Sequence, residues 1–174
     1  MRLCGVTLVA GALLAGCGQG TTPDPGGGGG GNVDPTNVPP PPTTSSGQCN
    51  DISASGGTIT DQRGAAAPAL NGGAMADGTY VLTKYEWYQP NQLHTRSITL
   101  VISGGGRYGQ YLWQRDSEPE QRVTVNIATS ADRIAMRGIC PAGTDLEWDR
   151  YNVGGSGLTL YSTRDAKAAF FARQ

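Results

Sequence analysis

Period-two alternation dominates the sequence from Thr79 to the C-terminus. Runs of β-branched and aromatic residues alternate with Thr, Arg, Asp, Glu and Gln, and each run ends at a cluster of Gly, Pro, Asn, Asp or Ser. Such runs predict half-buried β-strands separated by turns. The sequence predicts eight strands, at residues 79–88, 96–103, 107–115, 121–128, 133–140, 145–153, 158–163 and 167–172.

One face of most predicted strands is apolar. The faces are formed by Ile98, Leu100 and Ile102; by Val123, Val125 and Ile127; by Ile134, Met136 and Cys140; and by Leu158 and Leu160. Short turns between successive strands predict antiparallel hairpins. A meander of such strands shares one core when it closes into a barrel, and closure also removes exposed edges. We therefore expect an all-β fold, an eight-stranded antiparallel up-and-down barrel, with an open sandwich as the alternative.

The predicted meander opens with the triplet Gly78-Thr79-Tyr80. Together with the eight-strand meander, this start resembles the lipocalin-like (calycin) class, whose barrels begin at a Gly-x-Trp motif with the Trp closing one end. Tyr80 stands here at the position of the Trp, and the resemblance covers residues 79–174 in pattern. It implies a lipocalin-like barrel and binding of a small apolar ligand, although a fold alone does not settle function.

The N-terminal residues point to export. Arg2 precedes an uncharged apolar run that is shorter than the ~20 residues needed to span a bilayer, and this pattern is typical of a secretory signal peptide. The run ends in Leu14-Ala15-Gly16-Cys17, which resembles the lipobox of bacterial lipoproteins. The resemblance implies that residues 1–16 are a signal peptide and that Cys17 carries acyl chains such as palmitate. A plain signal peptide with a chance Cys is the alternative.

A spacer follows the predicted anchor. Residues 17–48 contain six consecutive glycines and four consecutive prolines, a composition that does not bury enough apolar surface to fold. We therefore expect a lipidated Cys and a disordered linker at 17–48, and the β-barrel domain at 49–174. Gly18 replaces the Asp that retains many lipoproteins at the inner membrane, so the resemblance implies a cell-envelope protein anchored at the outer membrane.

The predicted domain retains Cys49 and Cys140. Exported proteins favour disulfides, so we expect these two residues to be bonded. A metal or redox pair is the alternative, but no CxxC spacing is present. The domain has equal numbers of basic and acidic side chains and lacks the charge of a nucleic-acid binder. We expect a monomer with no nucleic-acid partner, no cofactor and no metal.

Aromatic residues recur in several predicted strands. Some face the expected interior, where Tyr and Trp stack on a sugar or hold an apolar molecule. Ordinary core packing is the alternative. Arg150 follows Leu146 and Trp148 on the predicted inward face. The candidate ligand-binding residues are Tyr85, Trp87, Tyr111, Trp113, Trp148 and Arg150.

Catalytic chemistry has little support in the sequence. His94 is the single histidine and has no Gly-x-Ser-x-Gly motif to work with, so we expect an exposed imidazole beside a turn. Asp145, Glu147 and Asp149 alternate along one predicted strand, which predicts a solvated acidic face, with a Ca²⁺ site as the alternative.

The sequence therefore predicts a non-enzymatic envelope lipoprotein that binds a small apolar ligand or an envelope component. A structural or interaction lipoprotein with a fully packed barrel is the alternative. An envelope hydrolase is the least favoured class.

Overall fold

The computed structural model describes residue 44 and residues 47–174, so the predicted signal peptide, Cys17 and most of the linker lie outside the described residues. Within them all regular structure is β. The strands are β1 (Ile59–Thr60), β2 (Gln62–Arg63), β3 (Gly78–Trp87), β4 (Thr95–Ser103), β5 (Tyr108–Arg115), β6 (Gln121–Ser130), β7 (Arg133–Cys140), β8 (Arg150–Gly154), β9 (Gly157–Ser162) and β10 (Lys167–Arg173). No helix in this part of the chain is long and apolar enough to cross a membrane.

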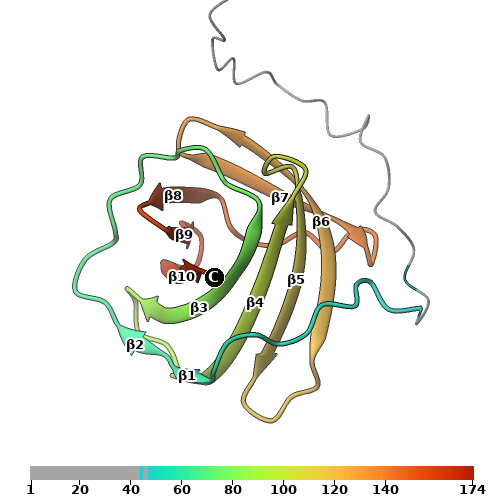
Figure 1. Cartoon of the computed structure of the whole chain (residues 1–174). Coiled ribbons are helices and arrows are strands. Elements are labelled where there is room, and N and C mark those ends of the chain that lie inside the picture. The colour runs from blue at the N-terminus through green and yellow to red at the C-terminus, as the bar shows by residue number, and fades with distance from the viewer. Residues whose placement is uncertain (1–43, 45–46) are drawn as a thin grey trace, which may run out of the picture.

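Strands β3 to β10 form a closed antiparallel barrel (Figure 1). Strands β4 to β10 lie side by side in chain order, and β3 closes the ring by pairing with both β10 and β4. This closure confirms the predicted eight-stranded up-and-down barrel and excludes the open sandwich. All the apolar strand faces consequently point into one interior.

The two ends of the barrel are built differently. The end that we call the closed end contains the start of β3 and the short turns β4–β5, β6–β7 and β8–β9. The open end contains the end of β3, the β9–β10 turn and the longer connections β3–β4, β5–β6 and β7–β8. Short turns keep neighbouring strands paired to their tips, whereas longer connections let the strands separate.

Large apolar side chains fill the closed half of the interior. They include most of the predicted inward residues of β4, β6, β7 and β9, and the larger ones are Leu82, Leu100, Ile102, Val125, Ile127, Ile134, Met136, Leu158, Leu160 and Phe171. Tyr80, which replaces the expected Trp, is buried at this end and donates a hydrogen bond from its hydroxyl to the Ala76 carbonyl (2.8 Å). Tyr151 does the same to the Gly73 carbonyl (2.8 Å). Residues 72–77 thus seal the closed end.

Two β-bulges change which side chains face inward. In β3 the pairing with β10 passes from Leu82 to Lys84 and leaves Thr83 as an extra residue. The bulge turns Tyr85 and Trp87 to the same side as Leu82, and bulges often adjust side chains in this way beside sites. A second bulge falls at Ile139 of β7. It places Cys140 on the outside, so the prediction that Cys140 shares the inward face is wrong.

The predicted strand 145–153 is only partly present. The structure has a regular strand at Arg150–Gly154, and β8 shares one paired position with β7, Arg133 with Arg150. Residues 141–149 form a loop that touches β7 through an isolated bridge between Leu146 and Met136. The strand begins late because this segment crosses the gap between β7 and β8 instead of lying in the sheet.

Residues 49–58 run across the outside of β6, β5 and β4 before the chain enters β1 and β2 (Figure 1). The predicted disulfide between Cys49 and Cys140 is confirmed, with Cα atoms 5.1 Å apart. The fully buried Asn50 donates to the Val123 carbonyl (3.2 Å), and the Ser55 amide donates to the Thr99 hydroxyl (3.0 Å). The disulfide therefore links this outer segment to the start of loop 141–149.

Candidate functional site

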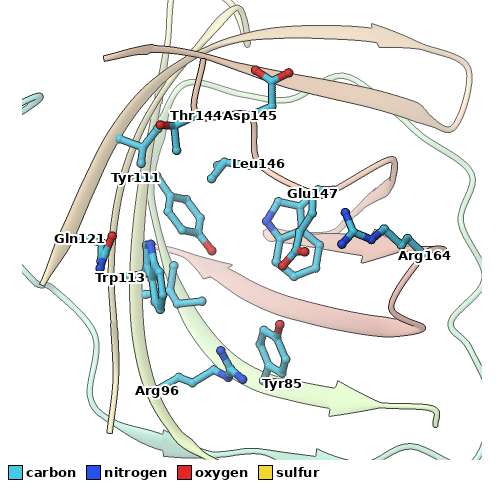
Figure 2. Close-up of a pocket in the computed structure, with 13 residues that line it drawn as sticks. Tyr85, Arg96, Tyr111, Trp113, Gln121, Thr144, Asp145, Leu146, Glu147 and Arg164 are labelled. Atoms are coloured by element: carbon cyan, nitrogen blue, oxygen red, sulfur yellow. The ribbon is translucent and has the colours of Figure 1, made fainter. Parts of the chain in front are cut away.

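A pocket of about 330 Å³ occupies the open half of the barrel. This volume is within the range of small-molecule sites. The pocket is lined by Tyr85, Arg96, Ile98, Tyr111, Trp113, Gln121, Val123, Thr144, Asp145, Leu146, Glu147, Trp148 and Arg164. Strands β3 to β6 supply the walls, and loop 141–149 covers the mouth together with Arg164 of the β9–β10 turn (Figure 2).

The floor of the pocket is an ion pair that depends on β1 and β2. Strands β3 and β4 pair only near the closed end, and β1 pairs with β4 while β2 pairs with β3 in the fork between them. Asp61 lies at this junction and is fully buried. Its Oδ1 accepts from Arg96 Nε (2.8 Å), and its Oδ2 accepts from Trp87 Nε1 (3.0 Å) and the His94 amide (3.2 Å).

Arg96 faces the pocket from β4. Its guanidinium lies 4.2 Å from the centre of the Tyr85 ring and 5.9 Å from that of Trp87, which is cation–π geometry. The hydrogen bond to Asp61 uses Nε. Arg96 thus lines the pocket with its charge balanced by the buried carboxylate.

A second balanced cation stands beside the loop. Lys167, with a side chain 6% exposed, contacts Glu147 and lies 3.0 Å from Asp165 Oδ2. Its Nζ lies 5.4 Å from the Trp87 ring and 5.6 Å from the Trp148 ring. A hydrogen bond with Glu147, with the Lys167 ammonium beside it, lowers the pKa of Asp165. Lys167 thus joins the loop to the β9–β10 turn.

Two phenol groups point into the pocket. Figure 2 shows the hydroxyls of Tyr85 and Tyr111 directed into the space that the lining residues enclose. Burial raises the pKa of both groups, against the opposing effect of Arg96 at Tyr85 and of a hydrogen bond with Trp148 at Tyr111. Both therefore stay protonated near neutral pH and are available as donors. Tyr85 is buried as a residue, but its hydroxyl is not among the fully buried side-chain atoms without a partner, since it borders the pocket space.

Most of the predicted ligand-binding residues meet at this pocket. Tyr85, Tyr111, Trp113 and Trp148 line it. Trp87 is not a lining residue; it lies behind Tyr85, with ring centres 5.8 Å apart, and bonds Asp61.

Arg150 is placed differently from the prediction. It forms an ion pair with Asp132, and its side chain is 33% exposed. Trp148 and Tyr151 are both buried although they lie three residues apart. The regular alternation of inward and outward residues is therefore interrupted in the loop before β8. Arg150 therefore faces outward, and the prediction that it faces inward is wrong.

The acidic residues of 145–149 do not share one solvated strand face, which corrects that prediction. Asp145 accepts from the Gly138 amide (3.1 Å), Glu147 contacts Lys167, and Asp149 accepts from the Thr163 amide (2.7 Å). Three separate partners hold them because the loop crosses between strands. Among residues 44 and 47–174 no group of three or more His, Cys, Asp and Glu side chains is placed to hold a metal ion.

His94 is less exposed than expected, with a side chain 18% exposed, and its Nδ1 lies 2.6 Å from Asp116 Oδ2. Asp116 also accepts from the Thr95 amide (2.8 Å). The hydrogen bond from the Thr95 amide is the largest cause, and the one with His94 the next, of a pKa of Asp116 that is lowered to about 2. The pair fixes the connection before β4 and does not line the pocket.

Sequence reasoning missed the three charged residues that shape the pocket. Arg96 lies two and four residues before Ile98 and Leu100, so on a strand it shares their face. Lys167 is related in the same way to Ala169 and Phe171. Alternation extended to the strand ends would have placed both inside the barrel. Asp61 has a weaker signal, the short β-branched run at 58–60.

Comparisons with known proteins add no relative. No protein-family model, no curated protein and no solved structure matches the chain. The functional argument therefore depends on the sequence and on the geometry of the pocket.

Proposed function

We propose that this protein is a lipid-anchored lipoprotein of the bacterial cell envelope whose barrel binds a small molecule and performs no catalysis. The observation that carries the binding role is the pocket of about 330 Å³ in the open half, with four aromatic side chains in its lining. Aromatic rings supply apolar contact area at a low cost in conformational entropy. A barrel with a purely structural role has no need of an interior pocket ringed by Tyr and Trp.

The placement of the barrel on a tether supports an envelope role. The lipobox-like Leu14-Ala15-Gly16-Cys17 would place acyl chains on Cys17, and two or more chains anchor a protein stably. The Gly- and Pro-rich spacer would hold the barrel away from the bilayer. Gly18 supports the outer membrane as its location. We also propose that the barrel is lipocalin-like, since Tyr80 lies at the closed end where that class places its Trp.

Native mass spectrometry of the full chain, extracted from the envelope in a mild detergent, tests the binding role. We expect a bound small molecule in addition to the acylated protein. The Trp113→Ala variant should lose this molecule, because the change removes one wall of the pocket. Tyr161→Phe, on β9 outside the pocket, is the control and should retain it. A bare protein mass in every preparation would contradict binding and favour the structural alternative.

Metabolic labelling with an alkyne fatty acid tests the anchor independently. The wild-type chain should take up the label and fractionate with outer membranes. Cys17→Ser should remain unlabelled, because the residue that the lipobox-like motif marks for acylation is gone. Labelling of Cys17→Ser, or an unlabelled wild-type chain, would overturn the anchor without affecting the pocket.

A further inference from the structure

We infer that the pocket takes an uncharged saccharide unit, a ring that offers both an apolar face and hydroxyl groups. This inference rests on the proposed binding role and narrows it. It departs from an apolar ligand, which the lipocalin-like resemblance implies, because of the polar groups that reach the pocket.

The lining contains more polar than aliphatic side chains. The wholly aliphatic members are Ile98, Val123 and Leu146, whereas Arg96, Gln121, Thr144, Glu147 and the two Tyr hydroxyls present polar atoms. Burying a polar group without a partner costs free energy. Arg96 and Glu147 are paired with Asp61 and Lys167, but an apolar molecule would still displace water from the remaining polar atoms without pairing them, and a molecule rich in hydroxyls would pair them.

The Tyr85 hydroxyl is the clearest of these groups. Tyr85 lines the pocket, its hydroxyl is directed into the enclosed space (Figure 2), and the hydroxyl is therefore accessible to a bound molecule. A hydroxyl that borders a pocket pairs with water or with a ligand. A ligand oxygen is such a partner, and the Tyr111 hydroxyl is placed to donate to the same molecule.

The charges around the pocket favour a neutral molecule. Arg96 is neutralised by the fully buried Asp61 (2.8 Å), and Lys167 faces two carboxylates, Glu147 and Asp165, so neither cation is left unpaired to receive an anion. At the rim, Asp145 and Arg164 have opposite signs. A fatty-acid carboxylate would bring a further charge to a floor whose cation is already paired, and an unpaired buried charge is costly.

The aromatic rings fit the apolar face of a sugar ring. Trp113 is half-buried and lies in the wall next to Tyr111, while Trp148 packs edge-on against Tyr85 with ring centres 6.2 Å apart. An exposed Trp ring binds the apolar face of a ligand, and neighbouring hydrogen-bond donors fix the orientation of that ligand. Stacking on Trp113 with hydrogen bonds to the two phenols would use both properties of such a ring.

Isothermal titration of the full chain, in a detergent without a sugar headgroup, tests the inference. The neutral sugar probes are glucose, N-acetylglucosamine and cellobiose, and the charged probes are glucuronate and palmitate. Adenosine serves as an uncharged ligand whose base presents hydrogen-bonding groups different from those of a sugar. We expect at least one neutral sugar to bind. If glucose binds, its affinity should be at least tenfold higher than that of glucuronate.

Variants separate the pocket from the rest of the protein. Trp113→Ala should weaken sugar binding at least tenfold, and Tyr85→Phe several-fold, because the latter keeps the ring and removes only the donor. Tyr161→Phe makes the same change outside the pocket and should leave binding unchanged. Circular dichroism confirms that each variant is folded. Equal affinities of wild type and Tyr85→Phe would overturn the role of the hydroxyl and with it the inference.

The outcomes distinguish the inference from the binding role beneath it. Binding of palmitate, glucuronate or adenosine without any neutral sugar overturns the inference and leaves a small-molecule function standing. A co-purified mass that is identified as a neutral saccharide supports it even when the probes do not bind. A bare protein mass together with no binding of any probe overturns both.

Discussion

The same strands that fill the closed half of the barrel with hydrocarbon bring charge into the open half. On β4 the inward residue changes from Leu100 to Arg96, and on β10 from Phe171 to Lys167. Leu100 is stabilised by apolar burial, which has no preferred direction. Arg96 depends on one carboxylate and on ring contacts at fixed positions. Directional pairs hold side chains in place without filling space, and this is why the open half retains a pocket.

The connections between strands also differ between the two halves. The closed half is sealed by its own short turns and by residues 72–77. The open half depends on segments distant in sequence, with β1 and β2 in one gap and loop 141–149 in the other. The following changes test whether the two halves are indeed stabilised in these different ways.

Removal of the disulfide is expected to have the largest effect. The double variant Cys49→Ser, Cys140→Ser opens a link between residues 91 positions apart, and the chain-entropy model predicts a loss of about 4–5 kcal/mol. Urea unfolding measures the change. Hydrogen exchange at Leu100 and Leu160 should quicken only as far as the loss of global stability requires, whereas loop 141–149 should quicken further through local opening. Equal acceleration in both halves would contradict the separation.

Loss of the Asp61 charge is expected to be next. Asp61→Asn leaves Arg96 buried without a carboxylate, and breaking such a pair costs about 3–5 kcal/mol. The control is Asp132→Asn, which breaks the partly exposed pair with Arg150 and should cost at most about 1 kcal/mol. Thermal unfolding compares the two variants. Equal losses would show that the floor of the pocket does not depend on Asp61.

A cavity made in the closed half should lower the free energy of unfolding more than a substitution that enlarges the pocket. Leu160→Ala, at a fully buried side chain, should lower the free energy of unfolding by about 2–5 kcal/mol and leave ligand binding intact. Trp113→Ala should cost less stability, because its ring is half-buried beside an existing space, yet should abolish binding. The reverse ranking in chemical denaturation and titration would refute the division of roles.

The smallest effect is expected at Asp116. Its pKa is about 2 in the folded chain against an ordinary value of 3.8. A lowered folded pKa gives stability that is present above the ordinary value and lost as pH falls through the folded one. Stability should therefore decline between about pH 4 and pH 2, and Asp116→Asn should flatten that decline. An unchanged pH profile would remove the role of this carboxylate.

Local pattern predicted most of the barrel. The predicted strand 133–140 matches β7. The predicted strands 96–103 and 167–172 differ from β4 and β10 by one residue at one end, and 158–163 is displaced by one residue from β9. Each of these strands alternates and ends at a clear turn signal, so neighbouring residues suffice to define it. Closure follows, because one-sided apolar strands need a shared core.

Long-range contacts account for what was missed. Residues 145–149 alternate like a strand, but Glu147 is drawn to Lys167 and Asp149 to Thr163, and both partners come later in the chain. The bulge at Thr83 is defined by pairing with β10. Asp61 acquires its role only when β3 and β4 separate. The pocket therefore combines aromatic residues that the sequence suggested with charges that only the folded chain brings together.

An experimental electron-density map of the full chain, purified from the envelope and soaked with the tightest neutral sugar from the titrations, tests the account most directly. We predict a ring of density, separate from the polypeptide, bounded by Tyr85, Tyr111 and Trp113, with one ring oxygen or hydroxyl within hydrogen-bond distance of the Tyr85 hydroxyl. The closed half should show only side chains. A map in which loop 141–149 fills the open half with its own side chains, or in which the sugar is bound elsewhere, would contradict the account.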